Sequence, residues 1–251
     1  MGLISTALPD LAATAAAATA TVVKDQGSAG VAFFNNLRVP AALVAAAAIK
    51  DAFVLQSAPK DIEHSRAWTL LRNSYLLLMM IAFTSEVSTI FIATHAMTQL
   101  QTSKTNTAAE SVVALLIREL EFELVGCRCQ FVTGLLAFVL AQGLRLRLVF
   151  RRHAALAKAS LCFLISTAFG LLTYHNAHSI TYGGYSGLVR RWGQLSSRML
   201  VLRVSPRRPA ALVALATALA SLLYAVAQVH EAYQPNPRQV HDTLLQDACQ
   251  P

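Results

Sequence analysis

Glu86 is the residue whose type and position most clearly suggest chemistry. It lies inside an apolar run at 75–97, where the only other charged or basic group is His95. A carboxylate in the middle of a membrane costs on the order of 3 kcal/mol, so it requires a partner, a proton or a function. Glu86 is therefore the first candidate for an intramembrane ion site.

A second set of polar residues lies in the apolar segment that follows. Glu121 and Arg128 are seven residues apart, which places them on nearly the same helical face, and Gln142 lies two heptads further on. If the two segments are antiparallel neighbours, Glu86 and Arg128 lie at similar depth and are predicted to form a buried, bidentate ion pair. The competing interpretation is that such a pair only locks two helices together.

Imidazole and amide side chains near the segment ends suggest pigment binding. These groups can ligate the magnesium of a chlorophyll, and two histidines facing each other across helices can hold a haem iron. The competing interpretation is an interfacial histidine bonded to backbone or water. The candidate pigment ligands are His95, His175, His178, Gln130 and Gln142.

The other motifs do not predict catalysis or a metal centre. The sequence TYGGYSG at 181–187 has neither the dinucleotide fingerprint nor a P-loop lysine, and the chain contains no HExxH motif. Cys127 and Cys129 do not have a zinc-site spacing, so the cysteines are predicted to be free thiols. We therefore predict a non-enzymatic protein with no catalytic residue and no metal site.

The elements that carry these residues are predicted to be membrane helices. Hydrophobic residues make up 55% of the chain and charged residues 14%, against about 25% charged residues in soluble domains. Continuous Leu- and Ala-rich runs, rather than alternating ones, indicate helices. The sequence predicts an all-α polytopic protein with four transmembrane helices, at about 74–97, 124–144, 159–177 and 210–229.

The remaining segments complete the predicted organisation. Pro40 suits the first turn of a helix at 40–56, which is short for a span and contains Lys50 and Asp51. We interpret it as interfacial or half-spanning, with a full span as the alternative. The predicted division is a low-complexity segment at 1–39, this helix and a linker at 40–66, a four-helix bundle at 67–230 and a polar tail at 231–251.

Basic residues gather beside the apolar runs and account for the net charge of +8. The positive-inside rule places the link between the second and third spans, with both termini, in the cytoplasm or its organellar equivalent. The pattern of 188–204 predicts an amphipathic surface helix. Membrane lipids and other membrane subunits, not nucleic acid, are the expected partners. The arginines expected to contact them are Arg151, Arg152, Arg190, Arg191, Arg207 and Arg208.

The last predicted span carries a helix-packing signal. Small residues recur on it at three- and four-residue spacing, which lets helix backbones approach closely. These residues are Ala211, Ala214, Ala218, Ser221 and Ala225.

Two stretches carry a resemblance to other proteins. LLRNSYLLLMMIAFTSEVSTIFIATHAM at 70–97 and RELEFELVGCRCQFVTGLLAFVLAQGLR at 118–145 resemble uncharacterised multi-span membrane proteins of chlorophyll-c-type algae. This resemblance implies an accessory subunit of a photosystem–antenna assembly in the plastid thylakoid membrane, with chlorophyll or carotenoid as the expected cofactor.

Two alternatives remain open. A looser resemblance to Orai-type calcium channels, which also have four spans with acidic residues in membrane helices, favours a cation channel or proton-linked transporter using Glu86. A third possibility is a membrane-bound haem protein that uses His95 with a histidine from another span.

Overall fold

The computed structural model describes residues 23–52, 66–102, 106–150, 153–178 and 180–203, with isolated positions between 212 and 227. The chain divides into two compact units, one formed by 1–56 with 75–193 and the other by 57–74 with 194–251. The first unit holds most of the described side chains. Among the described residues, the regular elements of this unit are helices except for one short strand pair, which confirms the predicted all-α class.

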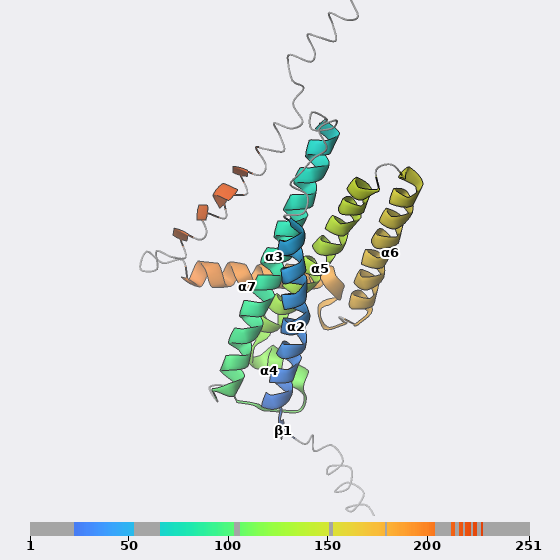
Figure 1. Cartoon of the computed structure of the whole chain (residues 1–251). Coiled ribbons are helices and arrows are strands. Elements are labelled where there is room, and N and C mark those ends of the chain that lie inside the picture. The colour runs from blue at the N-terminus through green and yellow to red at the C-terminus, as the bar shows by residue number, and fades with distance from the viewer. Residues whose placement is uncertain are drawn as a thin grey trace, which may run out of the picture. The chain divides into compact units, whose positions relative to one another are not determined.

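The elements follow one another along the chain as Figure 1 labels them. They are β1 (Lys24–Asp25), α2 (Gly27–Ala52), α3 (Arg66–Gln101), β2 (Ala108–Ala109), α4 (Val112–Glu119), α5 (Glu121–Val149), α6 (Ala154–His178), a 3₁₀ turn (Ile180–Tyr182) and α7 (Gly184–Arg203).

Four of the described helices are long and apolar enough to cross a membrane. The candidate spans are Gly27–Ala52, Trp68–Gln101, Glu121–Arg147 and Ala154–Ala177. Three of them correspond to predicted spans, each extended by several residues. The chain therefore has the architecture of an integral membrane protein. The predicted span at 210–229 falls largely outside the described residues.

Helix α2 differs from its prediction, because it begins at Gly27 and Pro40 lies in its interior. Its buried face runs through Gly30, Phe34, Ala41 and Ala45, so the helical periodicity continues across the proline. The sequence prediction placed Pro40 in the first turn, because the missing N–H of proline is no loss there. The full-span alternative thus describes α2 better than the short interfacial helix.

A crossing by α2 also changes the predicted arrangement of the ends. The carboxy-terminal ends of α2 and α5 then lie on one side of the membrane, and β1, β2 and α4 lie on the other. The amino-terminal end of α2 is consequently opposite the basic link between α5 and α6, whereas the prediction placed it on the same side.

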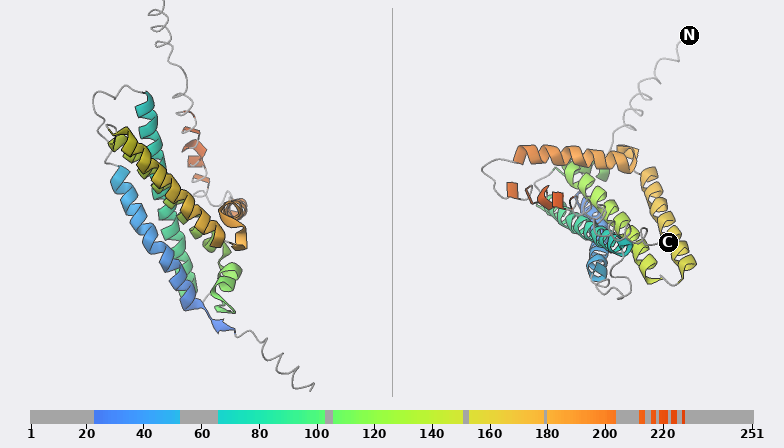
Figure 2. Two further views of the ribbon diagram at one scale, coloured as in Figure 1. Left: turned by 90° about the vertical axis from the view of Figure 1, so that its right-hand side faces the viewer. Right: turned by 90° about the horizontal axis from the view of Figure 1, so that it is seen from above.

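Helices α2, α3 and α5 form the core of the first unit. Figures 1 and 2 show α2 and α3 running side by side. One apolar cluster joins Phe34, Ala96 and Leu116 near the amino-terminal end of α2. A second joins Ala48, Met79 and Ala141 near its carboxy-terminal end. Small alanines in both clusters allow close helix packing without large side chains between the backbones.

A polar cluster ties these three helices together at the end that carries the basic residues. Oδ2 of Asp51 accepts hydrogen bonds from Gln142 Nε2 at 2.9 Å and Arg145 Nη1 at 2.6 Å. The Tyr75 hydroxyl donates a hydrogen bond to the backbone carbonyl oxygen of Asp51 at 2.7 Å. Asp51, which counted against a full span in the sequence, is therefore neutralised by an arginine on another helix.

We expect the substitution Arg145→Met to destabilise the bundle by about 2 kcal/mol, because it leaves the Asp51 carboxylate partly buried without its cation. Thermal unfolding in mild detergent, followed by circular dichroism, measures this change. Arg147→Met is the matched control, since Arg147 is exposed two positions further along α5. Equal unfolding temperatures for the two variants would contradict the prediction.

Candidate functional site

Glu86 is completely buried between α3 and α5. Its side chain is 0% exposed, and neither carboxylate oxygen has a hydrogen-bond partner among the described residues. Its neighbours Ser85 and Thr89 are also buried, but the Thr89 hydroxyl donates to the Ser85 carbonyl at 3.0 Å. The carboxyl group thus lacks the hydrogen bonds that buried polar groups ordinarily make.

Gly134 makes room for this carboxyl group. A Cβ atom built on Gly134 would lie 2.6 Å from Glu86 Oε1 and 2.9 Å from its Cγ. Glu86 and Gly134 both lie close to the midpoint of their candidate spans, so their contact is far from the ends of both helices. A glycine in an apolar helix is the sequence signal for such a close approach, and sequence reasoning overlooked it.

The predicted pair between Glu86 and Arg128 does not form. Gly134, which faces Glu86, is six residues beyond Arg128 on α5. Six residues correspond to about 9 Å along the helix axis and about 600° of rotation, which is one full turn plus roughly two thirds of another. Arg128 therefore lies at another depth along α5, and on another face of it, than Gly134. The predicted depth was wrong because the sequence did not give the register of α3 against α5.

Arg128 instead lines a groove between α2, α5 and α6. Its guanidinium lies 5.3 Å from the centre of the Phe33 ring, within the range of a cation–π contact. The groove has a volume of about 320 Å³. We name it the Arg128 groove, and it is lined by Phe33, Leu37, Arg128, Phe131, Val132, Leu135, Leu136, Leu171, Tyr174 and His175.

Glu121 pairs with Arg191 rather than with the other polar residues of α5. The Arg191 Nε and Nη2 atoms donate to the two carboxylate oxygens at 2.8 and 2.9 Å. This bidentate pair attaches the first half of α7 to the start of α5. The hydroxyl groups of Tyr185 on α7 and Thr133, near the middle of α5, form a second hydrogen bond at 2.7 Å. Arg191, predicted to contact lipid or a partner, therefore has an intramolecular role.

A tyrosine of the adjoining 3₁₀ turn lies close to these charges. The Tyr182 hydroxyl is buried and has no hydrogen-bond partner among the described residues. Burial, and then the negative charge of Glu121, raise the pKa of Tyr182, while Arg128 and Arg191 act in the opposite direction. The hydroxyl therefore stays protonated near neutral pH and can donate a hydrogen bond.

The predicted pigment ligands are not brought together. His95 lies on the exposed side of α3 and is bonded to Gln99 at 2.7 Å, whereas His175 lines the Arg128 groove and packs edge-on against Tyr185. Gln142 is bound to Asp51. Gln130 is half-buried on α5, and the side chain of His178 lies outside what the structure describes.

No histidine pair faces across the described helices in the way a bis-histidine haem requires. The described residues also contain no group of three or more metal-ligating side chains.

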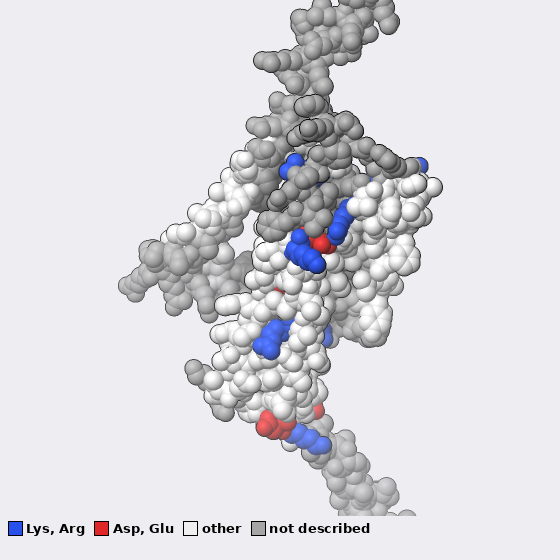
Figure 3. All heavy atoms as spheres, in the orientation of Figure 1, with Lys and Arg blue, Asp and Glu red and all other residues white. Residues whose placement is uncertain are grey.

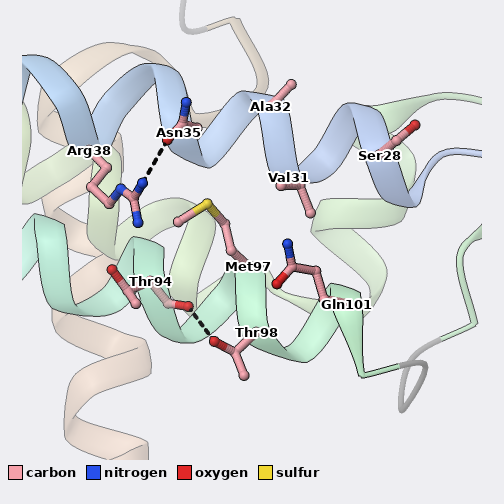
Figure 4. A pocket seen from close by; sticks show the side chains of 9 residues that line it. All are labelled: Ser28, Val31, Ala32, Asn35, Arg38, Thr94, Met97, Thr98 and Gln101. Atoms are coloured by element: carbon pink, nitrogen blue, oxygen red, sulfur yellow. Dashed lines mark hydrogen bonds between the residues drawn. The ribbon is translucent and has the colours of Figure 1, made fainter.

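A more polar pocket of about 430 Å³ lies on the other side of α2. We name it the α2–α3 pocket; Figure 4 shows the side chains that line it: Ser28, Val31, Ala32, Asn35, Arg38, Thr94, Met97, Thr98 and Gln101. Arg38 donates to Asn35 at 3.0 Å, and Thr98 donates to the Thr94 carbonyl at 2.9 Å. Some of the polar side chains that line the α2–α3 pocket therefore already make hydrogen bonds within their own helices.

Several predicted contact residues lie outside the described residues. They are Arg151, Arg152, Arg207, Arg208, Ala211, Ala214, Ala218 and Ala225. Of the same two predicted sets, Arg190 is exposed on α7, and Ser221 donates to the Thr217 carbonyl at 2.8 Å.

Comparisons with protein-family models, curated proteins and solved structures found no match to the chain.

We expect Gly134→Ala to destabilise the purified protein by about 2 kcal/mol, because the added methyl group overlaps the Glu86 side chain. The additional substitution Glu86→Ala should recover most of this loss, since it removes the overlapping atoms. Thermal unfolding in detergent measures both effects. Gly170→Ala is the control, because nothing lies within 4 Å of a Cβ at that position. If the loss of stability in the double variant equals the sum of the losses in Gly134→Ala and Glu86→Ala alone, the contact between the two residues is refuted.

Proposed function

We propose that this chain is a non-enzymatic integral membrane subunit that packs within a larger membrane assembly through the outward face of α6. The observation that carries the proposal is the exposure of a small-residue face on this helix. Within the membrane, small residues mark helix–helix contacts because they allow backbones to approach closely.

Helix α6 has the least buried of the four candidate spans. Only 11% of its apolar window is buried, against 44% for α5. Its exposed face carries small residues at three- and four-residue spacing, which we name the α6 small face: Ala159, Cys162, Ser166, Gly170, Thr173 and Ala177. A Cβ at Gly170 would meet no atom within 4 Å, so the face has room for a neighbouring helix.

The more specific form of this proposal is an accessory subunit of a photosystem–antenna assembly in an algal plastid. It is supported by the resemblance of 70–97 and 118–145 to proteins of chlorophyll-c-type algae. Under this proposal, chlorophyll or carotenoid sits at the interface with neighbouring subunits, because the predicted pigment ligands do not converge within the chain.

We expect Gly170→Leu to release the protein from its assembly, because a large side chain on the α6 small face displaces the neighbouring helix. Blue native electrophoresis of membranes solubilised in gentle detergent measures the size of the complex. Gly170 has open space around it within the chain, so the isolated subunit should retain its unfolding temperature.

Ile165→Leu is the matched control, since Ile165 is 36% exposed but lies about 100° around the helix from the middle of the α6 small face. This variant should remain in the large complex. A Gly170→Leu protein that migrates with the wild-type complex would contradict docking through α6. A wild-type protein that migrates as a monomer would contradict the subunit proposal itself.

A second candidate function is favoured by Glu86. A buried carboxyl group with no hydrogen-bond partner among the described residues adds no bond between the two helices, which favours a functional explanation over a purely structural one. Ionisable residues inside membrane helices commonly belong to proton or ion pathways. A proton-linked transporter or cation channel would use Glu86 as the group that binds and releases the proton or ion.

Under this second candidate, Glu86→Gln should reduce proton flux about ten-fold while the helical fold survives, because the amide has a similar shape but cannot carry the proton. Proteoliposomes containing a pH-sensitive dye measure the flux. Glu110→Gln is the control, since Glu110 is exposed and outside the candidate spans. If the chain is instead an accessory subunit, neither the wild-type protein nor the variants should carry proton flux.

A further inference from the structure

The Arg128 groove combines one cation with an apolar lining. Seven of its ten lining residues are Phe, Leu or Val, and Arg128 is the residue among them that carries a permanent charge. The groove opens outward, because Tyr174 is 66% and Leu171 39% exposed at its α6 edge. Its volume of about 320 Å³ falls within the range of small-molecule sites, roughly 300 to 1,000 Å³.

The shape of the groove follows from the helix arrangement. Helices α2 and α6 each pack against α5. Figures 1 and 2 show α5 between them when the views are taken together. The groove therefore has α5 as its floor, where Arg128, Val132 and Leu135 lie, and it faces the surroundings of the bundle. In a membrane, that surrounding medium is lipid.

Arg128 has no anionic partner among the described residues. The two carboxylates nearest to it on α5 are not its partners, because Glu121 is bound to Arg191 and Glu123 forms no ion pair with Arg128. Glu86, on α3, faces Gly134. The ring of Phe33 covers one face of the guanidinium but provides no charge. A cation inside a membrane segment is costly unless an anion or water satisfies it.

The depth of Arg128 suits a lipid headgroup. It lies two helical turns from Glu121, where the α5 candidate span begins, or about 10 Å along the axis. A long arginine side chain can reach from this depth toward the interface. Arginine binds phosphate oxygens through two parallel hydrogen bonds, and the Phe and Leu side chains match acyl chains.

We propose that the Arg128 groove binds a phospholipid with an anionic headgroup, whose phosphate pairs with Arg128 and whose acyl chain lies along Leu135 and Leu171. This site is independent of the subunit proposal, because it requires only the fold of the first unit and no partner chain. It also differs from the predicted pigment role of His175, since the recognised group is a phosphate.

Native mass spectrometry of the full-length protein in detergent tests the proposal. The probe is an equimolar mixture of phosphatidylglycerol and phosphatidylcholine with identical acyl chains. We expect one bound lipid, with phosphatidylglycerol preferred about ten-fold, because the charge-assisted contact adds to an otherwise equal apolar contact.

Four variants locate the site. Arg128→Met should abolish the preference, and Arg128→Lys should keep part of it, because lysine retains the charge but not the bidentate geometry. Leu135→Trp should remove the bound lipid by filling the groove while the cation remains. Arg38→Met is the matched control, since Arg38 lies within α2 and lines the separate α2–α3 pocket. Circular dichroism confirms that each variant is folded.

Any of the following three outcomes would overturn the proposal. Equal binding of the two lipids, or an unchanged preference in Arg128→Met, would show that Arg128 does not recognise the headgroup. Oleate that displaces phosphatidylglycerol at equal concentration would assign the site to a free fatty acid. A chlorophyll or carotenoid bound in the groove and lost with Leu135→Trp would assign it to a pigment.

Discussion

The close approach of α3 and α5 at Gly134 is the constraint on which the first unit depends. A side chain there would overlap Glu86, so the two backbones can meet only because Gly134 has none. Apolar clusters lie on either side of this level, and the buried polar residues next to Glu86, Ser85 and Thr89, do not bond its carboxyl group. The same packing that holds the helices together therefore leaves the Glu86 carboxyl group without a partner.

Two carboxylates of the first unit have the cationic partner that a low-dielectric environment requires. Asp51 accepts from Arg145 and Gln142, and Glu121 accepts from Arg191. These contacts lie near the ends of the candidate spans, where charge burial is cheaper than at mid-membrane depth. The front face in Figure 3 is correspondingly uncharged over most of its area. Glu86 and Arg128 lie deeper in their candidate spans, and neither has an oppositely charged partner among the described residues.

Composition and apolar run length were enough to predict the helical class and the positions of α3, α5 and α6, because membrane insertion depends on those properties directly. They did not predict the start of α2, since Pro40 and nearby polar residues interrupted the run. Ion pairing was harder to predict because it depends on helix register. Arg128 shares a sequence stripe with Glu121, yet the partner of Glu121 is on α7.

The separation of Glu86 and Arg128 has a physical explanation in the two faces of α5. Gly134 is directed at α3, where packing is tight and apolar, whereas Arg128 is directed at a groove that opens outward. If the two groups paired, their charges would cancel and neither site would attract an external ligand. Because they do not, the buried carboxyl group is left for the proposed role with a proton or small cation, and the half-buried guanidinium for the proposed role with a larger anion from the lipid phase.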